Sequence, residues 1–218
     1  MISLSEILHT IAQALMIPCL IILLILMAGA VWQIGDIVVE YIAERRKHKC
    51  NVPQLLRDVH TAGADGLADL IENSGLLRRQ KKALLELAES RNLPKDTLTA
   101  LAERLLATEE ARNAHTTSVT DMIAKLGPMF GLLGTLIPLG PGIVALGQGD
   151  TVTLSESMNV AFDTTIAGVI SAAVASVISH IRKRWYNDDM VSLETLMEAV
   201  LEEVTSDVEG VSFPPAVM

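Results

Sequence analysis

The sequence predicts an all-α membrane protein with three transmembrane helices and long helical extensions outside the bilayer. Three observations predict this fold. The 218-residue chain is 50% hydrophobic and only 3% aromatic, and its mean hydropathy is positive. Its 17 Lys and Arg residues fall in two blocks, residues 45–125 and 182–184. The long stretches without a basic residue are typical of segments that cross a bilayer.

Composition also argues against several functional classes. A net charge of -9 disfavours a nucleic-acid binder, which needs a basic surface, and seven aromatic residues disfavour an enzyme with a large aromatic pocket. The two cysteines, Cys19 and Cys50, have no partners at metal-ligand spacing, so we expect packing roles for them, with no disulfide, metal site or cofactor. No catalytic constellation or phosphate-binding glycine loop is present.

The first predicted span covers residues 11–34, which carry no charge and include the unbroken apolar run 20–27. About 20 apolar residues suffice to cross the bilayer. A cleaved signal peptide is the alternative, because Ala28-Gly29-Ala30 resembles a cleavage site. The basic amino-terminal region of such a peptide is missing and the apolar run is too long.

The second predicted span, residues 126–148, holds six glycines and three prolines and should therefore be an irregular helix. Backbone groups freed by proline are tolerated at membrane depth only where protein or water satisfies them. We therefore expect this span in the interior of an assembly. Gly127 and Gly131 have the spacing of closely packed transmembrane helices, and Gly134 continues the series.

The third predicted span, residues 157–181, has Asp163 as its one charge and is rich in small residues. Two stripes of small residues recur at every fourth position and indicate close helix contacts. One stripe contains Ala167, Ser171, Ala175 and Ser179, and the other contains Gly168, Ala172 and Ser176.

Charges at the ends of the spans predict the topology. The region before the first span has Glu6 and no base, whereas residues 44–49 and 182–184 are basic and should be cytoplasmic. The amino terminus is then outside and the carboxyl terminus inside the cell (inner) membrane. We divide the chain into residues 1–43, the outer terminus with the first span; 44–125, a cytoplasmic helical insertion; 126–184, a pore-lining hairpin; and 185–218, an acidic helix with a flexible tail.

The parts outside the bilayer read as helical. Ser74-Gly75 and Pro94 mark helix boundaries, and nothing after Lys95 interrupts a helix that could continue into the second span. The acidic tail has apolar residues at helical spacing, including Leu193, Leu196 and Val200, and predicts an amphipathic helix that needs a partner. We expect pairing with the basic helices of a neighbouring subunit. Residues after Gly210 should be loosely attached. The basic run 78–82 is a solvated helix face or a contact with anionic lipid.

Polar side chains at membrane depth are the candidates for function. They are Thr135 in the second span and Asp163, Thr164 and Thr165 in the third. Intramembrane ionisable groups are costly and usually face a bundle interior or an aqueous path. Each has a structural alternative, because threonine commonly bonds its own helix backbone and Asp163 could reach the outer interface.

Two segments carry a resemblance to a known family. Residues 127–135, Gly-Pro-Met-Phe-Gly-Leu-Leu-Gly-Thr, and residues 161–168, Ala-Phe-Asp-Thr-Thr-Ile-Ala-Gly, resemble the second- and third-span signatures of the MotA/TolQ/ExbB proton channel family. The resemblance covers residues 127–184 well, and the first span and the cytoplasmic insertion in topology and length only. The ExbB and TolQ branch has a glutamate five residues before the third-span threonine, where this chain has Val160.

The resemblance implies a homopentameric stator whose second and third spans line a pore around single-span ExbD/TolR/MotB-like partners that carry the ion-binding aspartate. The pore threonines correspond to Thr135 and Thr165, with Thr164 as the alternative and Asp163 as a further candidate on the ion path. The coupling ion is H⁺ or Na⁺. Independently, one three-span chain cannot enclose a pore, so a cyclic homo-oligomer is expected.

A second function, from a different class than an ion channel, stays open. A non-conducting oligomeric membrane scaffold could recruit soluble partners through its cytoplasmic helices, and it would need no aspartate-bearing companion. A solute transporter is disfavoured because only one span is broken by prolines and no inverted pair is found.

Overall fold

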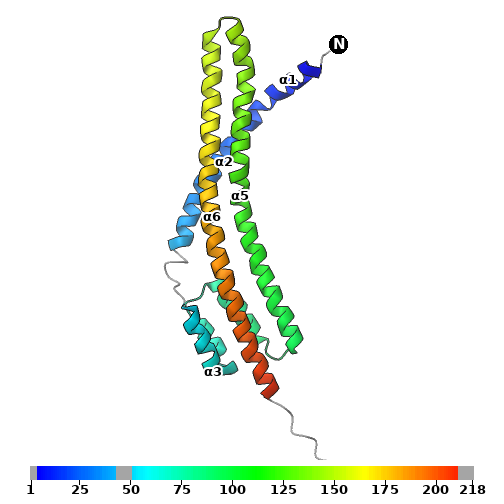
Figure 1. Cartoon of the computed structure of the whole chain (residues 1–218), viewed down its shortest axis with the longest axis vertical. Helices are drawn as coiled ribbons and strands as arrows, with labels where there is room; N and C mark the ends of the chain where they lie inside the picture. The colour runs from blue at the N-terminus through cyan, green and yellow to red at the C-terminus, as the bar shows by residue number, and fades with distance from the viewer. Residues whose placement is uncertain (1–3, 43–50, 211–218) are drawn as a thin grey trace, which may run out of the picture. The chain divides into compact units, whose positions relative to one another are not determined.

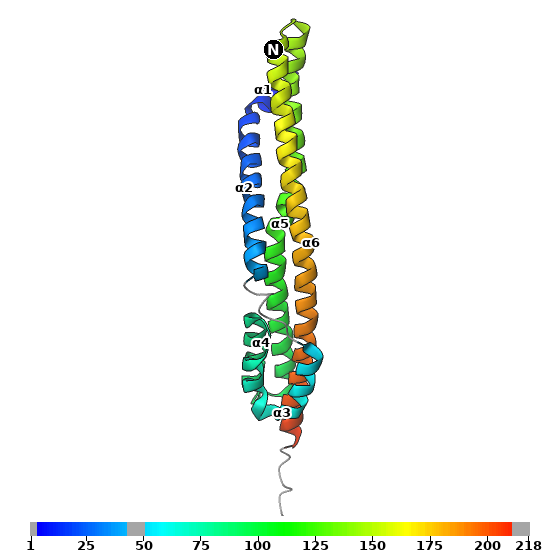
Figure 2. The same cartoon turned by 90° about the vertical axis from the view of Figure 1, so that its left-hand side faces the viewer.

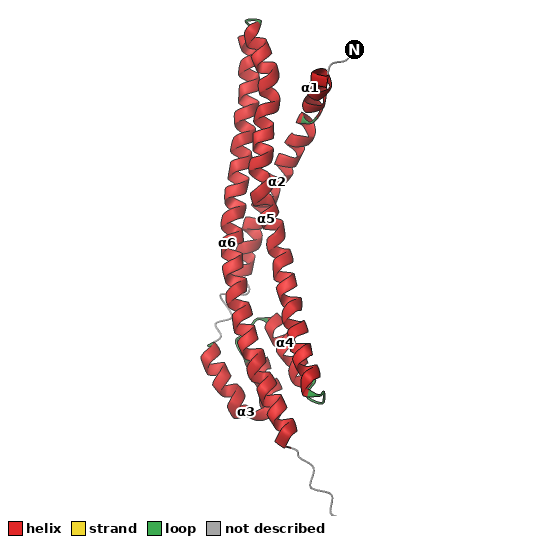
Figure 3. Ribbon diagram, turned by 45° about the vertical axis from the view of Figure 1, so that its right-hand side comes forward, coloured by secondary structure: helices red, strands yellow, loops and turns green. Residues whose placement is uncertain are grey.

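A computed structural model describes residues 4–42 and 51–210, and in this part of the chain all regular structure is helical (Figure 3). The helices, in chain order, are α1 (Leu4–Ala14), α2 (Met16–Glu40), α3 (Val52–Asn73), α4 (Arg78–Glu89), α5 (Lys95–Gly147) and α6 (Thr151–Gly210) (Figure 1). The chain divides into two compact units. Unit 1 contains residues 1–38 and 116–182, and unit 2 contains residues 39–115 and 183–218.

Among the described residues, three helical stretches are long and apolar enough to cross a membrane: Glu6–Glu40, Lys95–Gly147 and Thr151–Ser206. The predicted all-helical chain with three candidate spans is thereby confirmed. Residues 1–3, 43–50 and 211–218 lie outside the described residues, and with them Cys50, the basic run after the first span and the predictions made for the end of the tail.

The first span differs in detail from its prediction. A turn at Leu15 separates α1 from α2, and α2 continues to Glu40, past the predicted end at residue 34. Pro18 has no N–H to donate to the carbonyl of Ala14, and α1 ends at that residue. The helix resumes because the amide of Cys19 donates to the carbonyl of Leu15 at 3.0 Å.

The expected irregularity of the second span does not interrupt its helix. α5 runs unbroken through Pro128, Pro138 and Pro141, and the predicted continuity from Lys95 into this span is confirmed. Each proline removes only one backbone hydrogen bond, and the surrounding helical bonds maintain the helix. Pro138 cannot donate to the carbonyl of Gly134, so that oxygen lacks its normal helical donor.

A tight turn at residues 148–150 joins α5 to α6 within unit 1 (Figure 1). Gly149 has a φ of 78°, a left-handed conformation that glycine adopts without strain. Asp150 then caps α6, because its Oδ1 accepts the amides of Val152 and Thr153, both at 3.1 Å. The Thr153 hydroxyl donates to Oδ2 at 2.5 Å. These hydrogen bonds satisfy free amides at the helix start.

The Asp150 cap makes stability pH-dependent. The hydrogen bonds from Thr153 hold the pKa of Asp150 below its ordinary value of 3.8. Since the pKa is lower in the folded state, the stabilisation is present above the ordinary pKa and is lost as pH falls through the folded-state value. We expect Asp150→Ala to lower the melting temperature of the detergent-solubilised protein at pH 7, and the difference to shrink in acid. An equal difference at pH 7 and pH 3 would contradict this.

Unit 2 has its own apolar core, in which α3 and α4 meet the unit-2 portions of α5 and α6. Leu67 and Leu87 are fully buried there, and Leu196 and Val200 of α6 are 1% exposed. The apolar face of the acidic tail is therefore covered by helices of its own chain. The Gln80 side-chain amide donates to the carbonyl of Asp189 at 3.0 Å and links α4 to α6.

The boundaries of the unit-2 helices agree with the sequence signals. α3 ends at Asn73, where Ser74 donates its amide and its hydroxyl to the carbonyl of Ile71. α5 begins after Pro94. A bend at Gly63 with a φ of 65° divides α3, and this bend was not predicted.

Candidate ion-path site

Glycines bring α5 and α6 into backbone contact in unit 1. A Cβ added to Gly168 would lie 2.5 Å from the carbonyl oxygen of Gly127 and 2.9 Å from the Cα of Gly131. A Cβ on Gly127 would lie 2.7 Å from the carbonyl oxygen of Gly168 and 3.1 Å from the Cβ of Ala172. Only glycine permits this approach, so Gly127, Gly131 and Gly168, proposed for packing from their spacing, lie at a backbone contact between the two helices.

Thr164 belongs to the same contact. A Cβ on Gly134 would lie 2.6 Å from the Cβ of Thr164, whose side chain is therefore packed directly against α5. Thr164 is 5% exposed, and its hydroxyl donates to the carbonyls of Val160 and Ala161, each at 2.9 Å. In this structure Thr164 therefore packs α6 against α5.

Thr135 and Thr165 line one hollow between α5 and α6, although they are 30 positions apart in the sequence. The hollow has a volume of about 350 Å³, and its other walls are apolar. They are formed by Leu139 of α5 and by Met158, Ala161, Phe162 and Ile166 of α6. The surface of the hollow is almost entirely apolar, so the two threonines, one from each helix, line it mainly with carbon atoms.

Both hydroxyls use their protons on their own helices. The Thr135 hydroxyl donates to the carbonyl of Leu132 at 2.7 Å, and the Thr165 hydroxyl donates to the carbonyl of Ala161 at 2.9 Å. A hydroxyl oxygen has two lone pairs, which these bonds leave available as acceptors. The arrangement can accept hydrogen bonds from water or hydronium, or provide oxygen ligands to a small cation.

Asp163 and Ser176 occupy other positions. Asp163 is exposed on α6 and does not line the hollow. Ser176 is half-buried, and its carbonyl oxygen is bonded to Nδ1 of His180 at 2.8 Å. Among the described residues, no group of His, Cys, Asp and Glu is arranged to hold a metal ion.

Sequence reasoning missed a set of polar contacts in unit 1. The Arg182 guanidinium, 3% exposed, lies 2.5 Å from the carboxylate of Asp36 and ties α6 to α2. The Ser179 hydroxyl donates to the carboxylate of Asp121 and ties α6 to α5. The available signal was that Asp36 is the first acid after the uncharged first span and Arg182 the first base after the third.

Comparison with known proteins adds one finding. A family model described as the MotA/TolQ/ExbB proton channel family matches residues 71–195, more than half of the chain. The matched region includes the close-packed glycines and both threonines of the hollow. The search of curated proteins found no match.

Proposed function

Because the chain belongs to the MotA/TolQ/ExbB proton channel family, we propose that it is the channel-forming stator subunit of a motor driven by ion motive force. It is a multi-pass membrane protein of a transport family and not of an enzyme family. In the proposal it couples the flow of H⁺ or Na⁺ to mechanical work across the cell envelope. The membrane potential supplies roughly 2.3 kcal/mol per charge per 100 mV for such work.

The observation that carries the proposal is the hollow that Thr135 and Thr165 share. The hollow is almost wholly apolar, and the two hydroxyls that donate to their own helices beside it keep oxygen lone pairs; in the proposal these oxygens give a cation its polar contacts at membrane depth. Thr164 has no such role in the proposal, because it is packed under Gly134. Asp163 is exposed in the single chain, where a neighbouring subunit or a partner could meet it.

The proposed assembly is a homopentamer around single-span partners of the ExbD, TolR or MotB type, which carry the ion-binding aspartate. The described residues of one chain supply three candidate spans, too few to enclose a pore. Large apolar side chains on α5 and α6 remain exposed, and these are available to neighbouring subunits. Examples are Leu132, Leu136, Ile166 and Ile170.

The proposed orientation places the amino terminus outside and the carboxyl terminus in the cytoplasm, in the inner membrane. Residues 44–125 and 185–218 are then cytoplasmic, and the link at Asp150 is outside. The stacked rings of Tyr41 and Trp185, with centroids 6.1 Å apart, support an inner interface near these residues, because aromatic residues favour that zone.

Ion flux into liposomes tests the proposal directly. The chain is reconstituted with the single-span protein of a neighbouring reading frame, under separate H⁺ and Na⁺ gradients. We expect flux only with the partner, and we expect Thr135→Val with Thr165→Val to abolish it, because valine keeps the threonine shape without the hydroxyl.

A matched control is Thr99→Val with Thr108→Val on α5, where both hydroxyls also donate to carbonyls of their own helix. These exposed residues lie in unit 2, so flux should persist. A well-assembled complex that conducts neither ion would favour the alternative, a membrane scaffold that recruits soluble partners. Equal loss of flux in both double variants would also contradict the assignment of the hollow.

A further inference from the structure

Basic side chains cluster at the start of α4 in unit 2. Arg78, Arg79 and Lys82 are exposed and lie within the first five residues of the helix, and we call these three residues the basic patch. Lys81, which lies between them in the sequence, is half-buried, and its ammonium group donates to the carbonyl of Glu72 at 2.8 Å. This bond ties the start of α4 to the end of α3, and Figure 2 shows the two helices in contact within unit 2.

The charges of the basic patch are not compensated within the described part of the chain. Among the residues that the structure describes, no carboxylate forms an ion pair with Arg78, Arg79 or Lys82. The first turn of α4 holds no acid, although the positive end of the helix dipole favours acids there and disfavours bases. The three charges therefore do not stabilise their own helix, and they remain available to a partner with negative charge.

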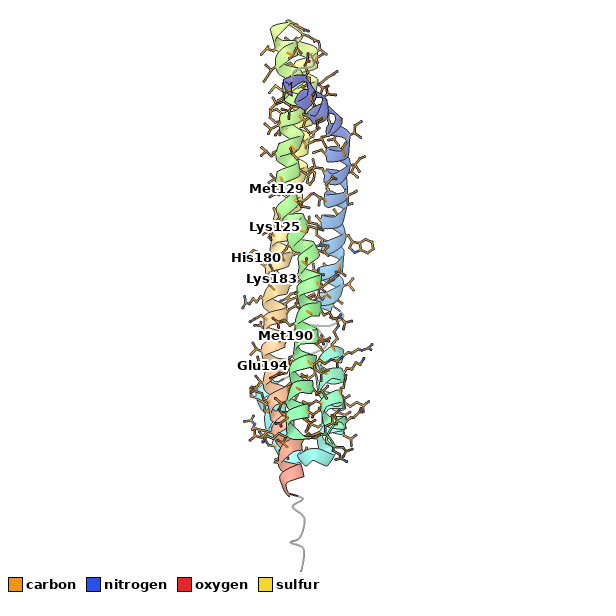
Figure 4. All side chains as sticks on the ribbon, turned by 90° about the vertical axis from the view of Figure 1, so that its right-hand side faces the viewer. Lys125, Met129, His180, Lys183, Met190 and Glu194 are labelled. Carbon is orange, nitrogen blue, oxygen red and sulfur yellow. The ribbon has the colours of Figure 1, made fainter. Side chains whose placement is uncertain are left out.

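A hydrogen bond defines the level of the basic patch along α6. The buried side-chain amide of Gln80, in the same turn as the patch, donates to the carbonyl of Asp189 at 3.0 Å. Asp189 follows Trp185 by four residues, which is about 6 Å along a helix. Figure 4 labels Lys183 and Glu194, which bracket this stretch of α6.

This level is close to the proposed inner interface of the membrane. The stacked rings of Tyr41 and Trp185 support an interface there, and Arg184, next to Trp185, is another exposed base. The negative surface potential of a cytoplasmic leaflet falls off within a Debye length, which is about 8 Å at physiological ionic strength. The separation of about 6 Å along α6 is shorter than this length. Arginine also matches phosphate oxygens in geometry, because its guanidinium presents paired N–H donors.

We propose that the basic patch binds the headgroups of anionic phospholipids in the membrane that the chain itself crosses. Lipid is the partner because the patch lies beside the proposed inner interface, where phosphate groups are concentrated. The contact holds the start of α4 at the bilayer surface. The inference rests on the proposed position of the interface at Tyr41 and Trp185, and it is independent of conduction through the hollow.

Hydrogen exchange of the full chain in lipid nanodiscs tests this contact without any measurement of flux. One set of nanodiscs contains phosphatidylcholine alone, and the other contains phosphatidylcholine mixed with phosphatidylglycerol. We expect the amides of residues 78–82 to exchange severalfold more slowly in the mixture, because bound headgroups shield this turn from water. Added NaCl should reduce the difference, because salt screens the surface potential. The amides at the start of α5 should exchange equally in both lipids.

A triple variant with Arg78→Gln, Arg79→Gln and Lys82→Gln should lose the effect of phosphatidylglycerol. Its folding is checked by protection in the second half of α4, which should be unchanged. The matched control, Arg78→Lys, Arg79→Lys and Lys82→Arg, changes the same positions but keeps the charge, so it should keep the effect.

Three results would overturn the proposal. The first is equal exchange of residues 78–82 in the two lipids, and the second is a glutamine variant that still responds to phosphatidylglycerol. The third is slower exchange with soluble polyglutamate in phosphatidylcholine nanodiscs but not with phosphatidylglycerol, which would indicate an acidic protein as the partner. None of these results depends on ion flux, so a failure here is separable from a failure of the proposed channel.

Discussion

Replacement of Gly168 by leucine is expected to separate α5 from α6 in unit 1. The first added carbon alone would lie 2.5 Å from the carbonyl oxygen of Gly127, and backbone cannot move aside as a flexible side chain can. Overpacking usually costs about 1–3 kcal/mol, and contact with backbone places this variant at or above the upper limit. Thermal unfolding of the purified protein in detergent should show a large fall in melting temperature.

The matched control for this variant is Gly35→Leu on α2. Gly35 is exposed and a Cβ there would meet no atom within 4 Å, so the same substitution adds the same apolar bulk without a clash. Its melting temperature should stay near that of the wild type. If Gly168→Leu unfolded at the same temperature as Gly35→Leu, the close approach of the two helices would be wrong. The hollow formed by Thr135 and Thr165 depends on that approach, so Gly168→Leu should also reduce ion flux.

The sequence predicted the end of α3 and the start of α5, because the signals there are local. Pro94 and Ser74 act within one helical turn, and charge-free length alone identifies a candidate span. The sequence predicted the contacts of small residues between α5 and α6 less completely. Spacing indicated that Gly127, Gly131 and Gly168 could pack, but only the structure gives the register that pairs Gly134 with Thr164.

At the candidate site, too, the sequence could not predict which side chains meet. Thr164 and Thr165 are adjacent, and neighbouring positions on a helix point about 100° apart, so the sequence could not decide between them. The structure packs the first against α5 and leaves the second in the hollow with Thr135. The contact between Arg182 and Asp36 joins residues 146 positions apart, and no local pattern predicts their pairing.

A substitution in the acidic tail, Val200→Asp, is expected to have the second large effect on stability. Val200→Asp should destabilise unit 2, because Val200 is 1% exposed in the apolar core that also contains Leu84 and Leu87. Aspartate is close to valine in size but would place an unpaired carboxylate there, which costs about 3–5 kcal/mol when the charge is uncompensated. Hydrogen exchange followed by mass spectrometry should show that the amides of α3 and α4 lose protection.

Val191→Asp provides the same substitution on the same helix at a site that is 55% exposed, and it should leave exchange in α3 and α4 unchanged. The pair of variants also tests the tail's partner. If the apolar face served a neighbouring subunit, as its sequence pattern allowed, Val200→Asp would dissociate the oligomer in native mass spectrometry while α3 and α4 kept their protection. Because the structure buries that face within its own chain, we expect Val200→Asp to remove the protection of α3 and α4. Any dissociation of the oligomer should then be a consequence of that loss.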